Sequence, residues 1–236
     1  MPSKRNKHTA AMSKTTTLSH TVSESHVVFL PFLVIVLIVW VLYRSIFHFP
    51  VWFDEIIGKA VFFGLPVSLY ISLTADKAIC QTYAIGKIYR GLLLGVLVGG
   101  VFGFVATITS FLARGVVIQS APLFSSNDFW WQFFLALMTG FWESLFFFSW
   151  VMIVVQQKYH RWELKWQLAM VVAIFVLFHI PNILLRSSSG LIVINQIILL
   201  AIFALGQGLL FLKTRNFYAL AISQAIWGMV LLVHTT

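Results

Sequence analysis

The stretch FWESLFFFSWV, Phe141–Val151, places a single carboxylate, Glu143, in an otherwise apolar and aromatic segment. It lies about midway through a longer apolar run, Phe129–Gln156. A charged side chain at the centre of a bilayer costs about 2.5–3.5 kcal/mol on insertion scales, so such residues usually face the interior of a helix bundle and mark function. The stretch therefore predicts a membrane-spanning helix that turns one functional carboxylate inward.

The rest of the chain has the same apolar character. Of its 236 residues 60% are hydrophobic and only 10% are charged, with a mean hydropathy of +0.92. A soluble domain of this length could not bury so much apolar surface, whereas runs of about 20 apolar residues span a bilayer. We expect an all-α, polytopic membrane helix bundle of about seven transmembrane helices. The predicted spans are His26–Phe47, Ile56–Ala75, Gly91–Ala113, Phe129–Gln156, Leu164–Leu185, Leu191–Leu212 and Phe217–His234.

The length of the fourth run, Phe129–Gln156, leaves open whether it is tilted or split, and a split would give eight helices. The polar segment 1–25 is expected to be a disordered N-terminal tail, and residues 26–236 to form a single transmembrane domain. One cysteine, Cys80, allows no intramolecular disulfide and no cysteine-based metal site.

The loops between the runs predict the orientation. Basic loops alternate with loops that are poor in basic residues, which by the positive-inside rule places the N-terminus in the cytoplasm and the C-terminus outside. The net charge of +9 is spread over these loops, so we expect the lipid bilayer and not nucleic acid as the partner. A compact chain with one cysteine fits an integral, multi-pass protein of a prokaryotic plasma membrane. The basic loop residues are Lys4, Arg5, Lys7, Lys14, Lys77, Lys87, Arg90, Lys158, Arg161, Lys165, Lys213 and Arg215.

Two basic residues and three regularly spaced glycines are expected to have structural roles. Arg44 and Lys59 lie near predicted span ends, where long basic side chains extend toward the membrane surface, so both are read as anchors. Gly95, Gly99 and Gly103 recur every four residues, and small residues on one face let helices approach closely. We expect these glycines to pack within the bundle.

A second apolar run, FVLFHIPN at Phe175–Asn182, holds a single histidine, His179. A lone buried histidine is more often a core residue than a catalytic one. Here Phe175 lies four residues before it and Asn182 three after, on the same helical face. Pro181 follows closely and can open the backbone locally. We therefore take Glu143 and His179 as a candidate intramembrane pair.

These residues resemble the CPBP family of intramembrane endopeptidases, which includes the type II CAAX prenyl proteases and bacteriocin-processing proteins. That family carries the motifs EExxxR, FxxxH and HxxxN on successive core helices. In ESLFFF, Glu143 keeps the first glutamate, while Ser144 replaces the second and Phe148 the arginine. FVLFH matches the second motif in full. In QAIWG, Gln224 stands at the histidine position and Gly228 at the asparagine position.

The resemblance covers roughly residues 54–234 and implies an intramembrane hydrolase that cleaves protein or peptide substrates. It implies that Glu143 activates a water, that His179 shares and positions that water, and that the third motif stabilises the oxyanion. Gln224 keeps an amide donor, whereas Gly228 has none, and losing one oxyanion donor typically costs about 10²–10³ in rate. Phe175, Asn182, Ser144 and Gly228 would line or support the site.

Family members are often described as metalloproteases, which raises the question of zinc. A catalytic zinc takes about three protein ligands, and only Glu143 and His179 are obvious candidates here. The sequence therefore favours a metal-free, glutamate-dependent mechanism, with no cofactor assigned.

Two other classes of function stay open. One is a catalytically inactive relative that binds proteins in the membrane, for example as an immunity or maturation factor, in which Glu143 is a relic or a structural hydrogen-bonding group. The other is a small transporter, although the chain shows no paired, Gly/Pro-broken helices of the transporter type.

Overall fold

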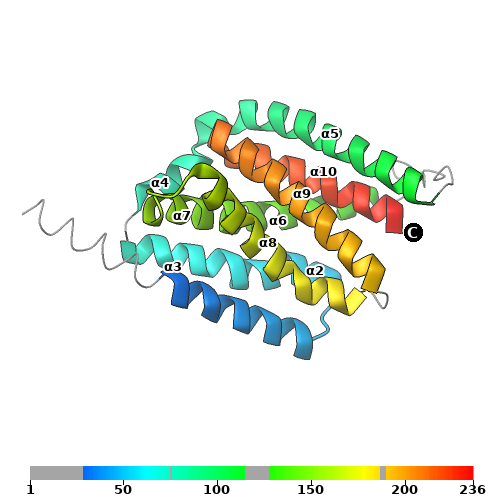
Figure 1. Cartoon of the computed structure of the whole chain (residues 1–236), viewed down its shortest axis with the longest axis horizontal. Helices are drawn as coiled ribbons and strands as arrows, with labels where there is room; N and C mark the ends of the chain where they lie inside the picture. Colours follow the sequence, from blue (N-terminus) through cyan, green and yellow to red (C-terminus); the bar gives the residue numbers. More distant parts are fainter. Residues whose placement is uncertain (1–28, 75, 115–127, 187–189, 236) are drawn as a thin grey trace, which may run out of the picture.

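The computed structural model describes residues 29–74, 76–114, 128–186 and 190–235, so the tail 1–25 lies outside the described residues. The chain is all-helical, at 92% helix and with no strand in the described part (Figure 1). A first helix, Phe29–Ile46, precedes α2 (Val51–Phe53), which continues through two π-helical segments, Asp54–Gly58 and Ala60–Gly64, into α3 (Leu65–Thr74). The later helices are α4 (Lys77–Cys80), α5 (Ile88–Arg114), α6 (Phe129–Glu143), α7 (Met152–Lys158), α8 (Leu164–Arg186), α9 (Gly190–Thr214) and α10 (Phe217–Thr235).

The predicted fold class, a polytopic membrane helix bundle, is confirmed. Six helical stretches of the described chain are long and apolar enough to cross a membrane, and a shorter apolar helix, Phe217–Met229, accompanies them. Two predicted starts were misplaced, because the second stretch begins at Val51 and not at Ile56, and the third at Ile85 and not at Gly91. Asp54 and Glu55 therefore belong to a helix and not to a loop. Both carboxylates have partners there, which is what allows them to enter an apolar helix.

The fourth span, Phe129–Lys158, forms the centre of the bundle and runs unbroken. Of its most apolar window 72% is buried, against 22–39% for the other five spans. Between α6 and α7 it passes through a π-helical segment, Ser144–Val151, whose side chains include the fully buried Phe146, Phe148 and Trp150. The span is therefore not split: it is one continuous helix whose geometry changes from α to π between Ser144 and Val151. Such π segments in helices are rare and often occur at functional sites.

Helix α10 packs along both α5 and α6, at the opposite side of the bundle from the first helix (Figure 1). The glycines of α5 make this approach possible. A Cβ at Gly95 would lie 2.6 Å from Ile222 Cβ, and one at Gly99 would lie 2.8 Å from Ile226 Cδ1. The predicted role of these two glycines in packing within the bundle is confirmed.

The first helix is attached to the rest of the bundle by polar contacts inside an aromatic contact zone. The Trp40 indole N–H donates to the backbone oxygen of Phe178 at 2.9 Å, and the Tyr43 hydroxyl donates to Asp54 at 2.5 Å. Arg44 forms an ion pair with Asp54 as well. The interpretation of Arg44 as an anchor extending to the membrane surface was therefore wrong: its side chain is only 15% exposed because it neutralises a helix carboxylate.

The close approach of α5 and α10 can be tested with two alanine substitutions on one helix. Gly95→Ala is expected to destabilise the protein by about 1–3 kcal/mol, because the new Cβ would clash with the side chain of Ile222 and the backbone of Ala219. Gly100→Ala is the matched control, since nothing lies within 4 Å of its added Cβ. Unfolding in detergent measures both. Equal stability of the two variants would contradict the packing described.

Candidate active site

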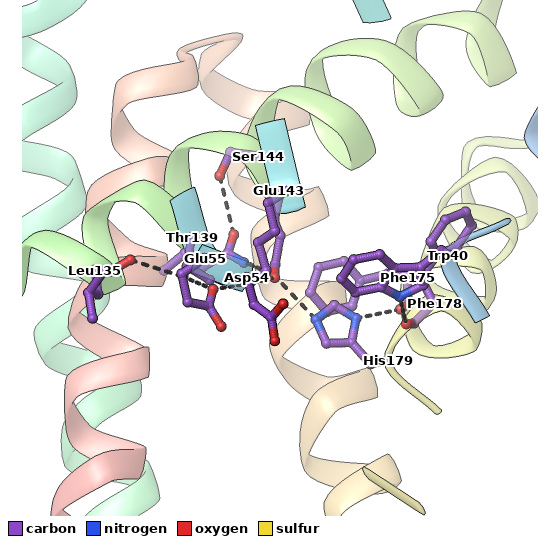
Figure 2. A network of polar contacts seen from close by, with 12 residues as sticks. Trp40, Asp54, Glu55, Leu135, Thr139, Glu143, Ser144, Phe175, Phe178 and His179 are labelled. Atoms are coloured by element: carbon purple, nitrogen blue, oxygen red, sulfur yellow. Dashed lines mark hydrogen bonds and ion pairs between the residues drawn. The ribbon is translucent and has the colours of Figure 1, made fainter. Parts of the chain in front are cut away.

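Glu143 ends helix α6 at the centre of the bundle, and its side chain is only 5% exposed. Both of its carboxylate oxygens have partners. Oε1 accepts a hydrogen bond from the Lys59 ammonium at 2.6 Å, and Oε2 accepts one from the Gln224 amide nitrogen. The His179 Nε2 atom lies 3.4 Å from the same Oε2 atom (Figure 2). Groups from four different helical stretches thus meet at one buried carboxylate.

The position of Lys59 overturns the expectation that it extends to the membrane surface. Its side chain is 7% exposed and its ammonium bridges two carboxylates, Glu143 at 2.6 Å and Glu55 at 2.5 Å. A lysine can reach the surface only if nothing inside the bundle holds its charge more strongly. The buried Glu143 and the half-buried Glu55 do so here, because a carboxylate inside the bundle would otherwise lose hydration without compensation.

His179 is oriented by its own helix. Its Nδ1 atom lies 2.8 Å from the backbone oxygen of Phe175, one turn earlier, and its ring stacks on the Phe175 ring with a centroid distance of 4.3 Å. Since a carbonyl oxygen can only accept, Nδ1 carries the proton in this contact. The Nε2 atom is then turned toward Glu143, as Figure 2 shows. Phe175 therefore sets both the plane of the imidazole and its tautomer.

Two side chains of the first and third motifs contact each other beside Glu143. The Ser144 hydroxyl donates to the Gln224 side-chain oxygen at 3.2 Å. This contact turns the amide nitrogen of Gln224 toward Glu143, to which it donates. Ser144 and Gln224, expected at the site from the sequence, thus lie within it.

Asn182 and Gly228 contribute less. The side-chain oxygen of Asn182 is buried and has no hydrogen-bond partner in the described part of the chain. At Gly228, an added Cβ would meet only Ala136, at 3.7 Å, so the missing side chain leaves an ordinary packing position. Neither residue shares a hydrogen bond with Glu143 or His179 among the described residues.

Three residues of the site were missed by the sequence interpretation: Glu55, Lys59 and Thr139. The Thr139 hydroxyl donates to Glu55, and Glu55 holds Lys59 from one turn earlier on the same helix. The spacing of Glu55 and Lys59, four residues apart with the acid first, was a visible signal for an ion pair. In contrast, nothing in the sequence indicated that Lys59 contacts Glu143, which lies 84 residues later.

Glu143 and His179 are the metal-ligand candidates of the sequence. In the part of the chain that the structure describes, no group of three or more His, Cys, Asp or Glu side chains is arranged to hold a metal ion. The Lys59 ammonium occupies the position beside Glu143 where a cation would otherwise neutralise it. The donor set therefore does not fit a zinc site, which needs about three protein ligands.

Comparison with known proteins gives a family-model match over part of the chain. Residues 125–230 match the family model described as type II CAAX prenyl endopeptidase Rce1-like. No curated protein and no solved structure gave a match. The matched residues contain Glu143, His179 and Gln224, whereas Glu55 and Lys59 lie outside them. The match over residues 125–230 is consistent with an intramembrane protease of the CPBP family.

Proposed function

We propose that this chain is an intramembrane endopeptidase in which Glu143 and His179 bind and activate a water for attack on a peptide bond. The observation that carries the proposal is the 3.4 Å approach of His179 Nε2 to Glu143 Oε2. When Nδ1 is the protonated nitrogen of a neutral imidazole, both facing atoms are acceptors. A water, with two O–H donors, is the small molecule that satisfies both.

In this mechanism the Oε2 atom of Glu143 takes one proton from the water as the water oxygen bonds to the peptide carbonyl carbon. The carbon–nitrogen bond then breaks, and the proton passes to the leaving nitrogen from Glu143 or through His179. The products are a carboxylic acid and an amine, so all atoms of the water are accounted for. The substrate is a protein or peptide segment that enters the bundle from the bilayer.

The developing oxyanion would be stabilised by Gln224. An amide nitrogen carries two N–H groups, and the contact with Glu143 uses one of them. Gly228 supplies no side-chain donor, so we infer that catalysis is slower by about 10²–10³ than with a full pair of donors.

A second candidate function has its own supporting observation. Both oxygens of Glu143 already accept hydrogen bonds, from Lys59 and from Gln224, which is also what a purely structural buried carboxylate needs. An inactive relative that binds membrane proteins, as an immunity or maturation factor, would retain this network without any reaction. Activity measurements separate the two candidates.

We place the N-terminus in the cytoplasm and the protein in a prokaryotic plasma membrane. The alternation of basic and basic-poor loops supports this orientation. The integral, multi-pass character itself follows from the spans and the family.

Substitution of the pair tests the proposed hydrolysis. We expect wild-type protein to generate new peptide termini in the membrane proteome that are absent with Glu143→Gln and with His179→Ala, because each change removes one of the two groups that hold the water. Labelling and sequencing of the termini, at equal protein levels, measures this.

The matched controls for that experiment are Glu163→Gln and His160→Ala, which remove the same side-chain types from exposed positions between α7 and α8. Both controls should keep the wild-type termini. If wild type, Glu143→Gln and His179→Ala gave identical termini, hydrolysis would be refuted. The result would favour an inactive relative that binds membrane proteins.

Metal removal gives a separate expectation. Because Glu143 and His179 do not form part of a three-ligand cluster, cleavage should survive treatment with 1,10-phenanthroline followed by buffer exchange. The yield of Glu143-dependent termini before and after treatment is the measurement. Loss of these termini together with their recovery on adding zinc would show that the mechanism is metal-dependent.

A further inference from the structure

Lys59 contacts Glu143 but has no role in the hydrolysis proposed above. Its ammonium lies 2.6 Å from Oε1 of Glu143 and 2.5 Å from Glu55, deep within the bundle. It comes from the second span, at the junction of the π-helical segments Asp54–Gly58 and Ala60–Gly64. The family match begins at residue 125, so it assigns nothing to either residue of this pair.

The ammonium distinguishes the two oxygens of Glu143. A free carboxylate can rotate about its last bond and present either oxygen, since that torsion is broad and two-fold. Here Oε1 makes a charge-assisted bond to Lys59, which is stronger than the bond from a neutral donor. Oε2 is the oxygen left toward His179.

Glu55 keeps Lys59 in this position. It pairs with Lys59 from four residues earlier, and Thr139 of helix α6 donates to the same carboxylate oxygen. A lysine held by a second acid on its own helix cannot extend toward the membrane surface without removing the counter-charge from both acids. The Glu55–Lys59 pair is thus a fixed unit that faces the fourth span.

We propose that Lys59, held by Glu55, is a positioning residue that fixes Glu143 so that Oε2 is the oxygen that takes the proton from the water. This inference rests on the proposed hydrolysis for its catalytic consequence, whereas the positioning itself can be measured without activity. The chain thereby has a carboxylate–cation pair beside Glu143 although positions 144 and 148 of its first motif hold serine and phenylalanine. Glu55 and Lys59 have the same four-residue spacing as those two positions.

A double-mutant cycle tests the positioning contact directly. Unfolding in detergent mixtures is measured for wild type, Lys59→Met, Glu143→Gln and the double variant. We expect the two changes to be coupled by about tenfold or more in the unfolding equilibrium constant, because they remove the two partners of one buried pair. Additive effects would overturn the proposal.

Lys165 and Glu163 provide the matched control cycle. Their ion pair has the same 2.6 Å length, but both side chains are more than two-thirds exposed. Lys165→Met and Glu163→Gln should therefore be coupled by less than about fivefold. If Lys59→Met does not fold, the folded yield of the Lys59→Met/Glu143→Gln double variant decides instead. Recovery of that yield supports the pairing, and a double variant as poor as the single one overturns it.

The catalytic consequence is measured from the termini that depend on Glu143 and His179. At equal amounts of folded protein, Lys59→Met should lower their yield by about 10²-fold, since a small misplacement of a catalytic group has effects of that size. Lys59→Arg keeps a charge at this position and should restore the yield to within about tenfold of wild type. Methionine fills the space of the lysine side chain but carries no charge, whereas arginine keeps the charge. Rescue by arginine and not by methionine would therefore show that the charge, and not the filling of space, positions Glu143.

The outcomes distinguish this inference from the proposed function. If Glu143→Gln and His179→Ala abolish the termini while Lys59→Met keeps the wild-type yield, hydrolysis stands and the positioning role is wrong. If no termini depend on Glu143, hydrolysis fails, and the double-mutant cycle alone decides whether Lys59 fixes Glu143.

Discussion

The buried ion pair between Lys59 and Glu143 is the constraint on which the arrangement of the centre depends. A carboxylate in an apolar helix bundle must find a partner, because the free energy lost with its hydration is large. Lys59 of the second span is that partner, and its Nζ atom lies 2.6 Å from Oε1 of Glu143 in the fourth span. The pair therefore fixes how these two spans face each other, and Glu55 and Thr139 surround the same contact.

Around this contact the bundle is built from buried aromatic side chains. Phe146, Phe147 and Phe148 come shortly after Glu143 in the same span and are fully buried. The Phe147 ring packs edge-on against Phe175, which in turn orients His179. A low-polarity wall of this kind strengthens every charge interaction inside it. The same stacking that holds the core together thus also aims the histidine at the carboxylate.

The polar side chains beside Glu143 satisfy one another. Ser144 donates to the Gln224 side-chain oxygen, and the Gln224 amide nitrogen donates to Glu143. Phe148 is fully buried and uncharged, so it needs no counter-charge. The positive charge beside Glu143 is that of Lys59. The arrangement therefore leaves no isolated charge among the described residues of the cluster.

The sequence by itself determined the class of protein and most of its spans, because hydropathy is a local property of the chain. It also predicted that Glu143 and His179 form a pair, and the structure brings these two side chains within 3.4 Å of each other. It also showed that glycines would lie at a helix contact. It could not place Lys59, Glu55 and Arg44, since a basic side chain near a span end can extend outward or pair inward. Which of the two occurs depends on whether an acid from another helix lies within reach. Only the tertiary structure decides that, as it brings together Lys59 and Glu143 from positions 84 residues apart.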